Sequence, residues 1–371
     1  MLKLSQPNIS DDAIAAVVEV LRSGQLVHGS ECEAFEKELA EYLRCREVIL
    51  VSSGTAALHV ALLALDIGPG DAVIVPDFTF PATANVVAMV GAKPVIVDVE
   101  PETYTLDPVC LKETIRAWQG PERLRAVMPV HEFGCPAAMD EIKQIASAHR
   151  LYVVEDAACA LGAVYKGQKT GTMGDIGCFS FHPRKTLTTG EGGAISTNNS
   201  EFARRLRRLR NHGMERTVQG MQFFEPATNY RLTNFQAALG RKQLPELDGW
   251  IKLRGKLASA YIDSLSQLEQ KGLIRLPKWV DGHSWQTFMI ALNESFDRAT
   301  VIESLRDSGI ESNLGAQSLS AIGIYGIQQS EQVIGPELYA CGLALPLFER
   351  MSIADVHRVC KTLSAVLVCI K

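Results

Sequence analysis

Three neighbouring stretches contain the most informative residues of the sequence: Glu155-Asp-Ala-Ala-Cys-Ala-Leu-Gly162, Gly177-Cys-Phe-Ser-Phe-His-Pro-Arg-Lys185 and Thr188-Thr-Gly-Glu-Gly-Gly193. Residues 151–155 are an apolar, β-branched run, which places Asp156 at the carboxyl end of a predicted strand. The next predicted strand ends near Ser180, and Lys185 follows it closely. Ligands of open α/β sheets bind at the carboxyl ends of the strands. We therefore expect a ligand site that contains Asp156 and Lys185.

The first half of the chain alternates between short β-branched runs and helical stretches. This alternation predicts an α/β fold with a mostly parallel seven-stranded sheet sandwiched by helices. The expected strands are residues 48–52, 72–76, 94–99, 126–130, 151–155, 178–181 and 193–197. The expected helices are residues 10–24, 30–43, 55–65, 83–90, 111–117 and 139–149.

Strands become rare after residue 197, where helices are expected at residues 201–210 and 233–244. From about residue 250 the pattern predicts a smaller α+β unit, with helices at 252–268, 299–308 and 353–369 and a strand at 286–292. We therefore divide the chain into a large domain, 1–248, and a small C-terminal domain, 249–371.

Composition excludes several classes of protein. The 371 residues are 47% hydrophobic and carry a net charge of -5, which argues against a dedicated nucleic-acid binder. No apolar run is long enough for a transmembrane helix, and the N-terminus lacks a secretory signal. The nine cysteines form no C-x-x-C pair, and the histidines have no metal-site spacing. We expect a cytoplasmic protein without a bound metal, a nucleic-acid partner or a membrane partner.

The pairing of Lys185 with Asp156 is the arrangement that pyridoxal 5'-phosphate (PLP) requires. The lysine forms the Schiff base, and the carboxylate pairs with the protonated pyridine nitrogen. A phosphate site is predicted at Ser52-Ser-Gly-Thr-Ala-Ala57, which follows a strand and opens a helix. Gly54 lets the backbone approach a ligand, and Thr55 can donate its hydroxyl. A capped, buried helix without a ligand remains the alternative for this segment.

Further motifs in the same order along the chain give the sequence a specific resemblance. They are Pro76-Asp-Phe-Thr-Phe-Pro-Ala-Thr-Ala-Asn85, Val130-His-Glu-Phe-Gly134, Asn211-His-Gly213, Asn229-Tyr-Arg-Leu-Thr-Asn-Phe-Gln-Ala-Ala238 and Leu345-Pro-Leu-Phe348. Together with the lysine and aspartate segments, they resemble the DegT/DnrJ/EryC1/StrS sugar aminotransferase family. This family lies within the PLP-dependent transferases of fold type I.

The resemblance implies roles for individual residues. Lys185 is the expected cofactor lysine, and Asp156 is the expected partner of the pyridine nitrogen. The other implied cofactor contacts are Phe80, stacked on the ring, and Gly54, Thr55 and Ser180, on the phosphate. The resemblance also implies a homodimer with shared active sites. Asn229 would reach the cofactor phosphate of the neighbouring subunit, and Arg231 is a weaker candidate for contact with the partner's substrate or amino donor.

Two positions depart from the family pattern. Cys159 stands where the family usually has glutamine or histidine, beside the expected ring hydroxyl of the cofactor. Residues 311–319 lack a histidine that the family often has at the substrate site. We therefore expect altered sugar recognition there and assign Asn313 and Gln317 to the substrate.

The resemblance implies an aminotransferase that moves an amino group, from L-glutamate, to a nucleotide-linked keto-sugar. One alternative is a PLP-dependent sugar dehydratase of the same family, although dehydratases replace the lysine by histidine and this chain has Lys185. A second alternative is a non-catalytic regulatory protein that binds PLP.

Overall fold

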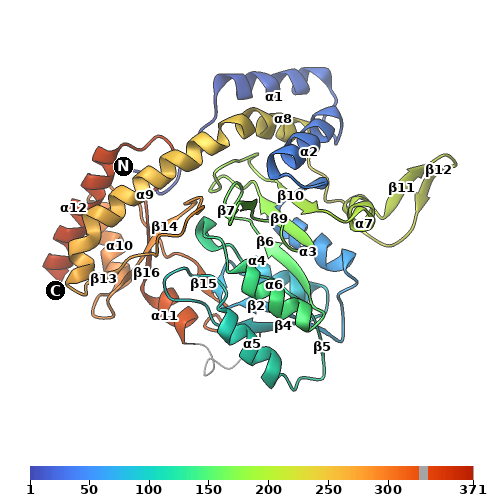
Figure 1. Cartoon of the computed structure of the whole chain (residues 1–371). Helices are drawn as coiled ribbons and strands as arrows, with labels where there is room; N and C mark the ends of the chain where they lie inside the picture. Colours follow the sequence, from blue (N-terminus) through green and yellow to red (C-terminus); the bar gives the residue numbers. More distant parts are fainter. Residues whose placement is uncertain (326–332, 371) are drawn as a thin grey trace.

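The computed structural model describes residues 1–325 and 333–370, and a seven-stranded sheet forms its centre (Figure 1). The strand order is β1-β10-β9-β6-β5-β2-β4. β10 runs antiparallel to both of its neighbours, and β9, β6, β5, β2 and β4 are parallel to one another. The mostly parallel seven-stranded sheet predicted from the sequence is thus confirmed. Its strands are β1 (Glu47–Val51), β2 (Asp71–Pro76), β4 (Lys93–Val97), β5 (Arg123–Val127), β6 (Tyr152–Asp156), β9 (Ile176–Ser180) and β10 (Gly193–Thr197).

Helices cover both faces of this sheet because its strands alternate their buried side chains between two cores. In β2, Val73 and Val75 face one core, whereas Ala72 and Ile74 face the other. The first face is covered by α3 (Gly54–Ala64), α4 (Ala82–Met89) and α7 (Ser200–Arg210). The second face is covered by α2 (Ser30–Leu43), α5 (Pro108–Ala117), α6 (Met139–Ala148) and α8 (Asn234–Gln243). Both faces are buried, as expected for a sheet of parallel strands.

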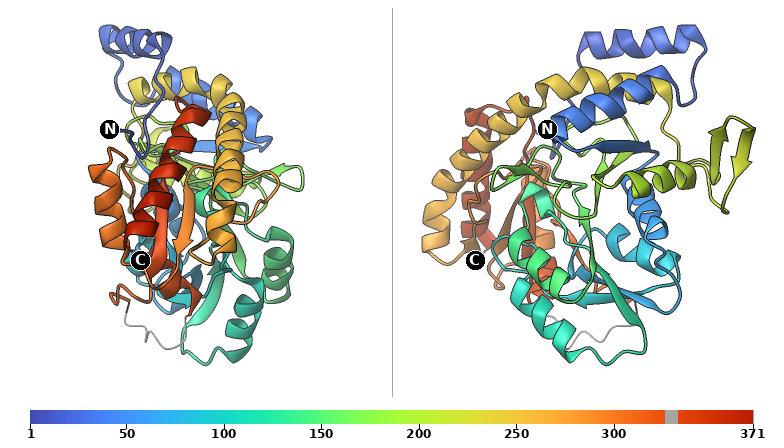
Figure 2. Two further views of the ribbon diagram at one scale, coloured as in Figure 1. Left: turned by 90° about the vertical axis from the view of Figure 1, so that its left-hand side faces the viewer. Right: turned by 45° about the vertical axis from the view of Figure 1, so that its right-hand side comes forward.

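The C-terminal part of the chain has its own hydrophobic core, which the long helix α9 (Leu247–Gln270) connects to the large sheet (Figure 2). Leu247 packs with the helices on the large sheet, whereas Leu257 and Tyr261 pack in the C-terminal core. Leu2 joins this second core by pairing with Ile310. The division of the chain at residue 248 stays a prediction. The C-terminal elements are β13 (Ile274–Arg275), β14 (Phe288–Leu292), α10 (Arg298–Asp307), α11 (Ile334–Cys341), β16 (Gly342–Leu345) and α12 (Ile353–Ile370).

A β-hairpin that the sequence did not predict projects from the body of the molecule (Figures 1 and 2). It consists of β11 (Met214–Thr217) and β12 (Gly220–Phe223). Its side chains Val218, Met221 and Phe223 are exposed, so no alternation between a buried and a solvated face marks these strands.

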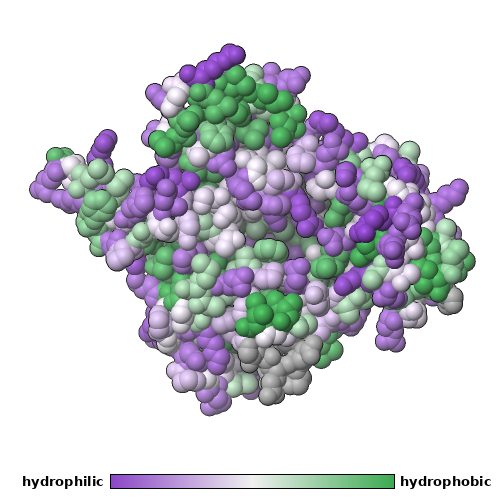
Figure 3. All heavy atoms as spheres, turned by 180° about the vertical axis from the view of Figure 1, so that it is seen from behind, coloured by the Kyte–Doolittle hydropathy of each residue, from purple (hydrophilic) through white to green (hydrophobic). Residues whose placement is uncertain are grey.

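The N-terminal helix α1 (Asp11–Ser23) also presents apolar side chains to the surface. Ile14 and Leu21 are exposed on it, and Figure 3 shows apolar residues gathered over this helix. None of the helices in residues 1–325 and 333–370 is both long and apolar enough to cross a bilayer.

Arg254 of α9 provides a test of how the C-terminal core is held. It is 1% exposed and donates to the Glu349 carboxylate over 2.6 Å and to the carbonyls of Trp285, Gln286 and Leu347. Arg254→Met leaves a buried carboxylate without its partner, which costs about 3–5 kcal/mol. Urea unfolding should show this loss.

The matched control is Lys252→Met on the exposed face of the same helix, which should change stability by less than about 0.5 kcal/mol. The double variant Arg254→Met, Glu349→Leu should recover part of the loss, because no unpaired charge remains. Equal stability of Arg254→Met and wild type would contradict the assignment.

Candidate active site

A cavity of about 490 Å³ lies where β6 and β9 end. It brings together eight of the residues that the sequence assigned to the site: Gly54, Thr55, Phe80, Asp156, Cys159, Ser180, Lys185 and Gln317. These residues come from segments far apart in the sequence. The rule that ligands bind at carboxyl strand ends therefore located this cavity.

Asp156 ends β6 and is 4% exposed. One of its carboxylate oxygens accepts a hydrogen bond from the Thr83 hydroxyl at 2.9 Å, and the other accepts from the Ala158 N–H at 3.1 Å. Burial raises the pKa of Asp156, although these two donors and Lys185 act in the opposite direction. Each oxygen keeps a free lone pair, so the carboxylate can accept a further hydrogen bond from a ligand.

Lys185 follows β9, and its Nζ donates to the Cys159 sulfur at 2.9 Å. Burial lowers the pKa of Lys185, but Cys159, Glu132 and Asp156 raise it by more, so the net pKa is above the usual value. Burial raises the pKa of the Cys159 thiol. The ammonium form of Lys185 is therefore favoured by its contact with Cys159 and by the acidic side chains Glu132 and Asp156.

The start of α3 forms a tight cradle at the cavity. Ser53 caps the helix by accepting from the Ala56 N–H at 3.0 Å. Within residues 1–325 and 333–370, the N–H groups of Gly54 and Thr55 have no hydrogen-bond partner. A Cβ at Gly54 would lie 2.8 Å from the Ser180 Cβ, so only glycine fits between the helix and the end of β9. This cradle can bind an anion.

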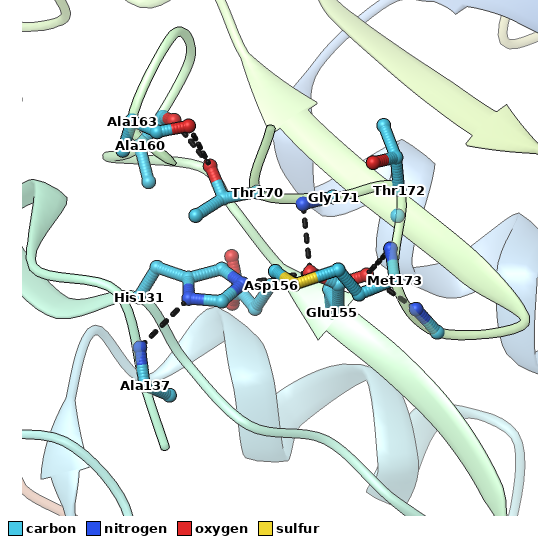
Figure 4. A network of polar contacts seen from close by, with 12 residues as sticks. His131, Ala137, Glu155, Asp156, Ala160, Ala163, Thr170, Gly171, Thr172 and Met173 are labelled. Atoms are coloured by element: carbon cyan, nitrogen blue, oxygen red, sulfur yellow. Dashed lines mark hydrogen bonds and ion pairs between the residues drawn. The ribbon is translucent and has the colours of Figure 1, made fainter. Parts of the chain in front are cut away.

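Beneath the cavity, the Glu155 carboxylate joins β6 to the loop that leads into β9 (Figure 4). It accepts from the backbone N–H groups of Gly171, Met173 and Gly174 at 2.6–2.7 Å. The His131 Nε2 lies 2.9 Å from the same carboxylate, and both side chains are fully buried.

The hydrogen bonds of His131 fix its tautomer. The Ala137 N–H donates to His131 Nδ1 at 3.0 Å, so the proton of the neutral ring is on Nε2 and is donated to Glu155. The sequence alone did not predict a role for Glu155 or His131.

Glu132 is a further cavity residue for which the sequence alone predicted no role. It is 4% exposed and follows the carboxyl end of β5. Burial raises its pKa to about 8; Lys185 lowers the pKa and Asp156 raises it further. The rule that identified Asp156 and Lys185, that residues just after strands matter most, applies equally to Glu132.

The C-terminal part of the chain supplies one wall of the cavity, which includes Gln317. Here β15 (Gln317–Ser318) pairs with β3 (Phe78–Thr79), beside Phe80, whose side chain is 67% exposed. Asp77 accepts from the Ser318 and Ser320 hydroxyls and from the Ser320 N–H.

A second buried aspartate anchors the same part of the chain. Asp98 accepts from the backbone N–H groups of Val333, Ile334 and Gly335 at the start of α11. The end of the large sheet is thereby tied to the segments on both sides of residues 326–332.

Three of the assigned residues lie outside the lining of this cavity: Asn229, Arg231 and Asn313. Asn229 is exposed and accepts from the Arg231 N–H, while the Arg231 guanidinium donates to Asn211. Asn313 is exposed and pairs with Ala344. Their expected contacts with cofactor or substrate stay predictions.

Known proteins are similar to this chain in sequence and in fold. The family model of the DegT/DnrJ/EryC1/StrS aminotransferase family matches residues 7–364. GDP-perosamine synthase from Caulobacter vibrioides is 38% identical over 341 residues, which cover 90% of this chain and 89% of that protein. The aminotransferase TlmJ from Streptoalloteichus hindustanus has a TM-score of 0.93 at 29% identity, with 100% of both chains covered. DesV from S. venezuelae, in complex with a ketimine intermediate, has a TM-score of 0.87 at 33% identity, with 97% of this chain and 99% of that chain covered.

The fold and these relatives are those of an aminotransferase. The chain belongs to the DegT/DnrJ/EryC1/StrS aminotransferase family. The family, the fold class and the enzyme class predicted from the sequence are therefore confirmed.

The close approach of Gly54 to Ser180 yields a prediction about anion binding. Gly54→Ala places a methyl group against Ser180 and displaces the start of α3, so the affinity for PLP should fall at least about tenfold. Absorbance titration with PLP measures this affinity. Gly249→Ala, where the added methyl group meets nothing within 4 Å, is the control and should bind PLP as wild type does. Unchanged affinity in Gly54→Ala would refute the cradle.

Proposed function

We propose that this protein is a PLP-dependent aminotransferase that moves an amino group from L-glutamate to a nucleotide-linked keto-sugar. The observation that carries the proposal is one cavity that contains Lys185, Asp156 and the cradle at Gly54. Family membership supports the reaction, and the 38% identity to a GDP-perosamine synthase supports a nucleotide-linked sugar.

The residues present fit PLP at three points. The unpaired N–H groups at Gly54 and Thr55 suit the phosphate, with the Ser180 side chain beside them. Asp156 retains the capacity to accept a hydrogen bond from the pyridine nitrogen. Lys185 supplies an amine to the same cavity as Asp156 and the cradle at Gly54. The exposed ring of Phe80 is free to stack on a planar ligand.

Bound PLP supplies an electron sink that stabilises negative charge on the substrate carbon. Lys185 Nζ would bind the cofactor and, as a free amine, would move a proton to and from the substrate carbon. The carboxylate of Asp156 keeps the pyridine nitrogen protonated. Gln317 belongs to the wall that a sugar would meet, and we keep Asn313 and Gln317 as proposed substrate contacts.

The experiment that tests the proposal uses the purified chain with PLP. L-glutamate alone should convert the cofactor to its amine form, and 3-keto and 4-keto sugars linked to GDP, UDP or dTDP should then gain nitrogen, as read by mass spectrometry. Lys185→Ala should abolish turnover. Asp156→Asn should lower it at least about 100-fold, because a neutral amide does not stabilise the protonated ring.

Other outcomes of this experiment would refute the proposal. A product without new nitrogen would identify a dehydratase. Cofactor binding without conversion by any amino donor would identify a non-catalytic PLP-binding protein. Conversion by another amino donor but not by L-glutamate would refute only the assignment of L-glutamate as the donor.

We infer further that the enzyme is a homodimer with shared sites. Asn229 and Arg231 lie outside the cavity of their own chain, next to the base of the projecting hairpin β11–β12. The exposed apolar side chains of this hairpin and of α1 are surfaces that a second copy could cover. In a two-fold dimer each chain lends the same loop to the other site.

Shared sites make a complementation test possible. Lys185→Ala inactivates the site in its own chain, and Arg231→Ala or Asn229→Ala should inactivate the site in the opposite chain. When the two inactive variants are refolded together, half of the dimers are mixed and each has one intact site. Activity should therefore recover to about a quarter of wild type. No recovery, while wild type refolds in parallel, would rule out shared sites built from these residues.

A further inference from the structure

Glu132 is an acidic cavity residue to which the proposed function gives no role. Its carboxyl is buried in the cavity that contains Lys185, Cys159 and Asp156. Asp156 is committed to its own donors and, in the proposed function, to the cofactor ring. Cys159 already accepts the hydrogen bond of the lysine nitrogen, and burial raises the pKa of its thiol. Glu132 therefore remains the acid whose charge is free to act on Lys185.

The backbone around Glu132 is built to keep its carboxyl in the cavity. The turn Glu132–Gly134 places Phe133 at φ 55°, a left-handed conformation that is strained for a non-glycine residue. Two contacts hold it there: the Gln286 N–H donates to the Phe133 carbonyl at 2.8 Å, and the Ser284 N–H donates to the Gly134 carbonyl at 3.0 Å.

Two threonine hydroxyls connect Glu132 with Asp156. The Thr79 hydroxyl lowers the pKa of the Glu132 carboxyl as a hydrogen-bond donor would, and Thr79 Oγ1 lies 3.2 Å from Thr83 Oγ1. Thr83 donates its single hydrogen to Asp156 at 2.9 Å. A protonated Glu132 donates to Thr79, which then donates to Thr83, and each contact has its hydrogen. An ionised Glu132 instead draws the Thr79 hydrogen to itself, so the site accommodates both states.

We propose that Glu132 is a positioning residue that acts through Lys185, by setting how strongly the lysine nitrogen holds its proton. The role in catalysis rests on the proposed function, because the lysine must become a free amine to move protons. The groups that face Glu132 are Lys185, Asp156, Cys159 and the Thr79 hydroxyl.

The electrostatics give the direction of the effect. Burial raises the pKa of Glu132 to about 8, against the opposing effect of Lys185. Glu132 in turn contributes to the raised pKa of Lys185. Below pH 8 Glu132 is mostly neutral and leaves Lys185 unaffected. Above pH 8 it is a carboxylate that favours the ammonium form of Lys185 and suppresses the free amine.

The test measures the free amine of Lys185 directly, without turnover. The PLP-free full chain is labelled with trace acetic anhydride at several pH values, and mass spectrometry compares the Lys185 peptide with that of exposed Lys252 as internal reference. At pH 9.5, Lys185 should be labelled about tenfold faster in Glu132→Gln than in wild type, which corresponds to a shift of about one pH unit. At pH 7 the two should be labelled equally.

Matched variants separate this role from a structural one. Cys159→Ala removes the sulfur that the Lys185 nitrogen contacts at 2.9 Å but leaves Glu132 in place, so the slower labelling that Glu132 causes above pH 8 should persist. Thr79→Val keeps Glu132 but removes a donor that stabilises its carboxylate. The slower labelling of Lys185 should therefore begin about one pH unit higher than in wild type. It also tests the proposal if Glu132→Gln fails to fold.

The labelling result can overturn the proposal independently of the enzyme assay. Equal labelling of wild type and Glu132→Gln at pH 9.5 would overturn it, as would a difference of the same size at both pH values. Failure of the transamination assay would refute the proposed function, yet it would leave the labelling result unchanged.

Discussion

The buried carboxylate of Glu155 is the interaction on which the active site depends. Its two oxygens are held by three backbone N–H groups and by His131, so the end of β6 is fixed to the loop that enters β9 (Figure 4). Successive residues of a strand point to opposite faces, so fixing Glu155 also fixes Asp156 toward the cavity. The same loop leads into the strand that precedes Lys185. A single carboxylate thus sets the geometry of both chemical groups.

Much of this architecture follows from local sequence patterns. The sheet strands are short apolar runs, and the strand-end rule placed Asp156, Lys185 and the start of α3 at one cavity. Boundaries were less accurate: the strand expected at 126–130 is β5 (Arg123–Val127), because its first half is polar and half exposed. An alternation of apolar and polar residues is the sequence signal for a strand with one buried face. The strands of the hairpin β11–β12 have no such alternation, so they were not predicted.

The remaining features depend on contacts between distant parts of the chain. Nothing near Gln317 in the sequence indicates that β15 pairs with β3 or that a wall of the cavity results. His131 and Glu155 each have an unremarkable local context, and their pairing depends on the neighbouring positions of β5 and β6 in the sheet. Asn229, Arg231 and Asn313 lie outside the lining of the cavity, so the contacts predicted for them require a partner or a ligand that the single chain does not contain.

Asp77 and Asp98 limit how the C-terminal segment of this chain can be exchanged. Both aspartates belong to the sequence around the large sheet, yet Asp77 accepts from Ser318 and Ser320, and Asp98 accepts from residues 333–335 in addition to its neighbour Val99. A replacement C-terminal segment without these donors would leave the Asp77 carboxylate unpaired and would remove three of the four N–H donors of Asp98. A chimera with a new substrate wall therefore needs the matching residues after β2 and β4 as well. In a chimera of this chain, the two distant blocks of sequence therefore need to be exchanged together.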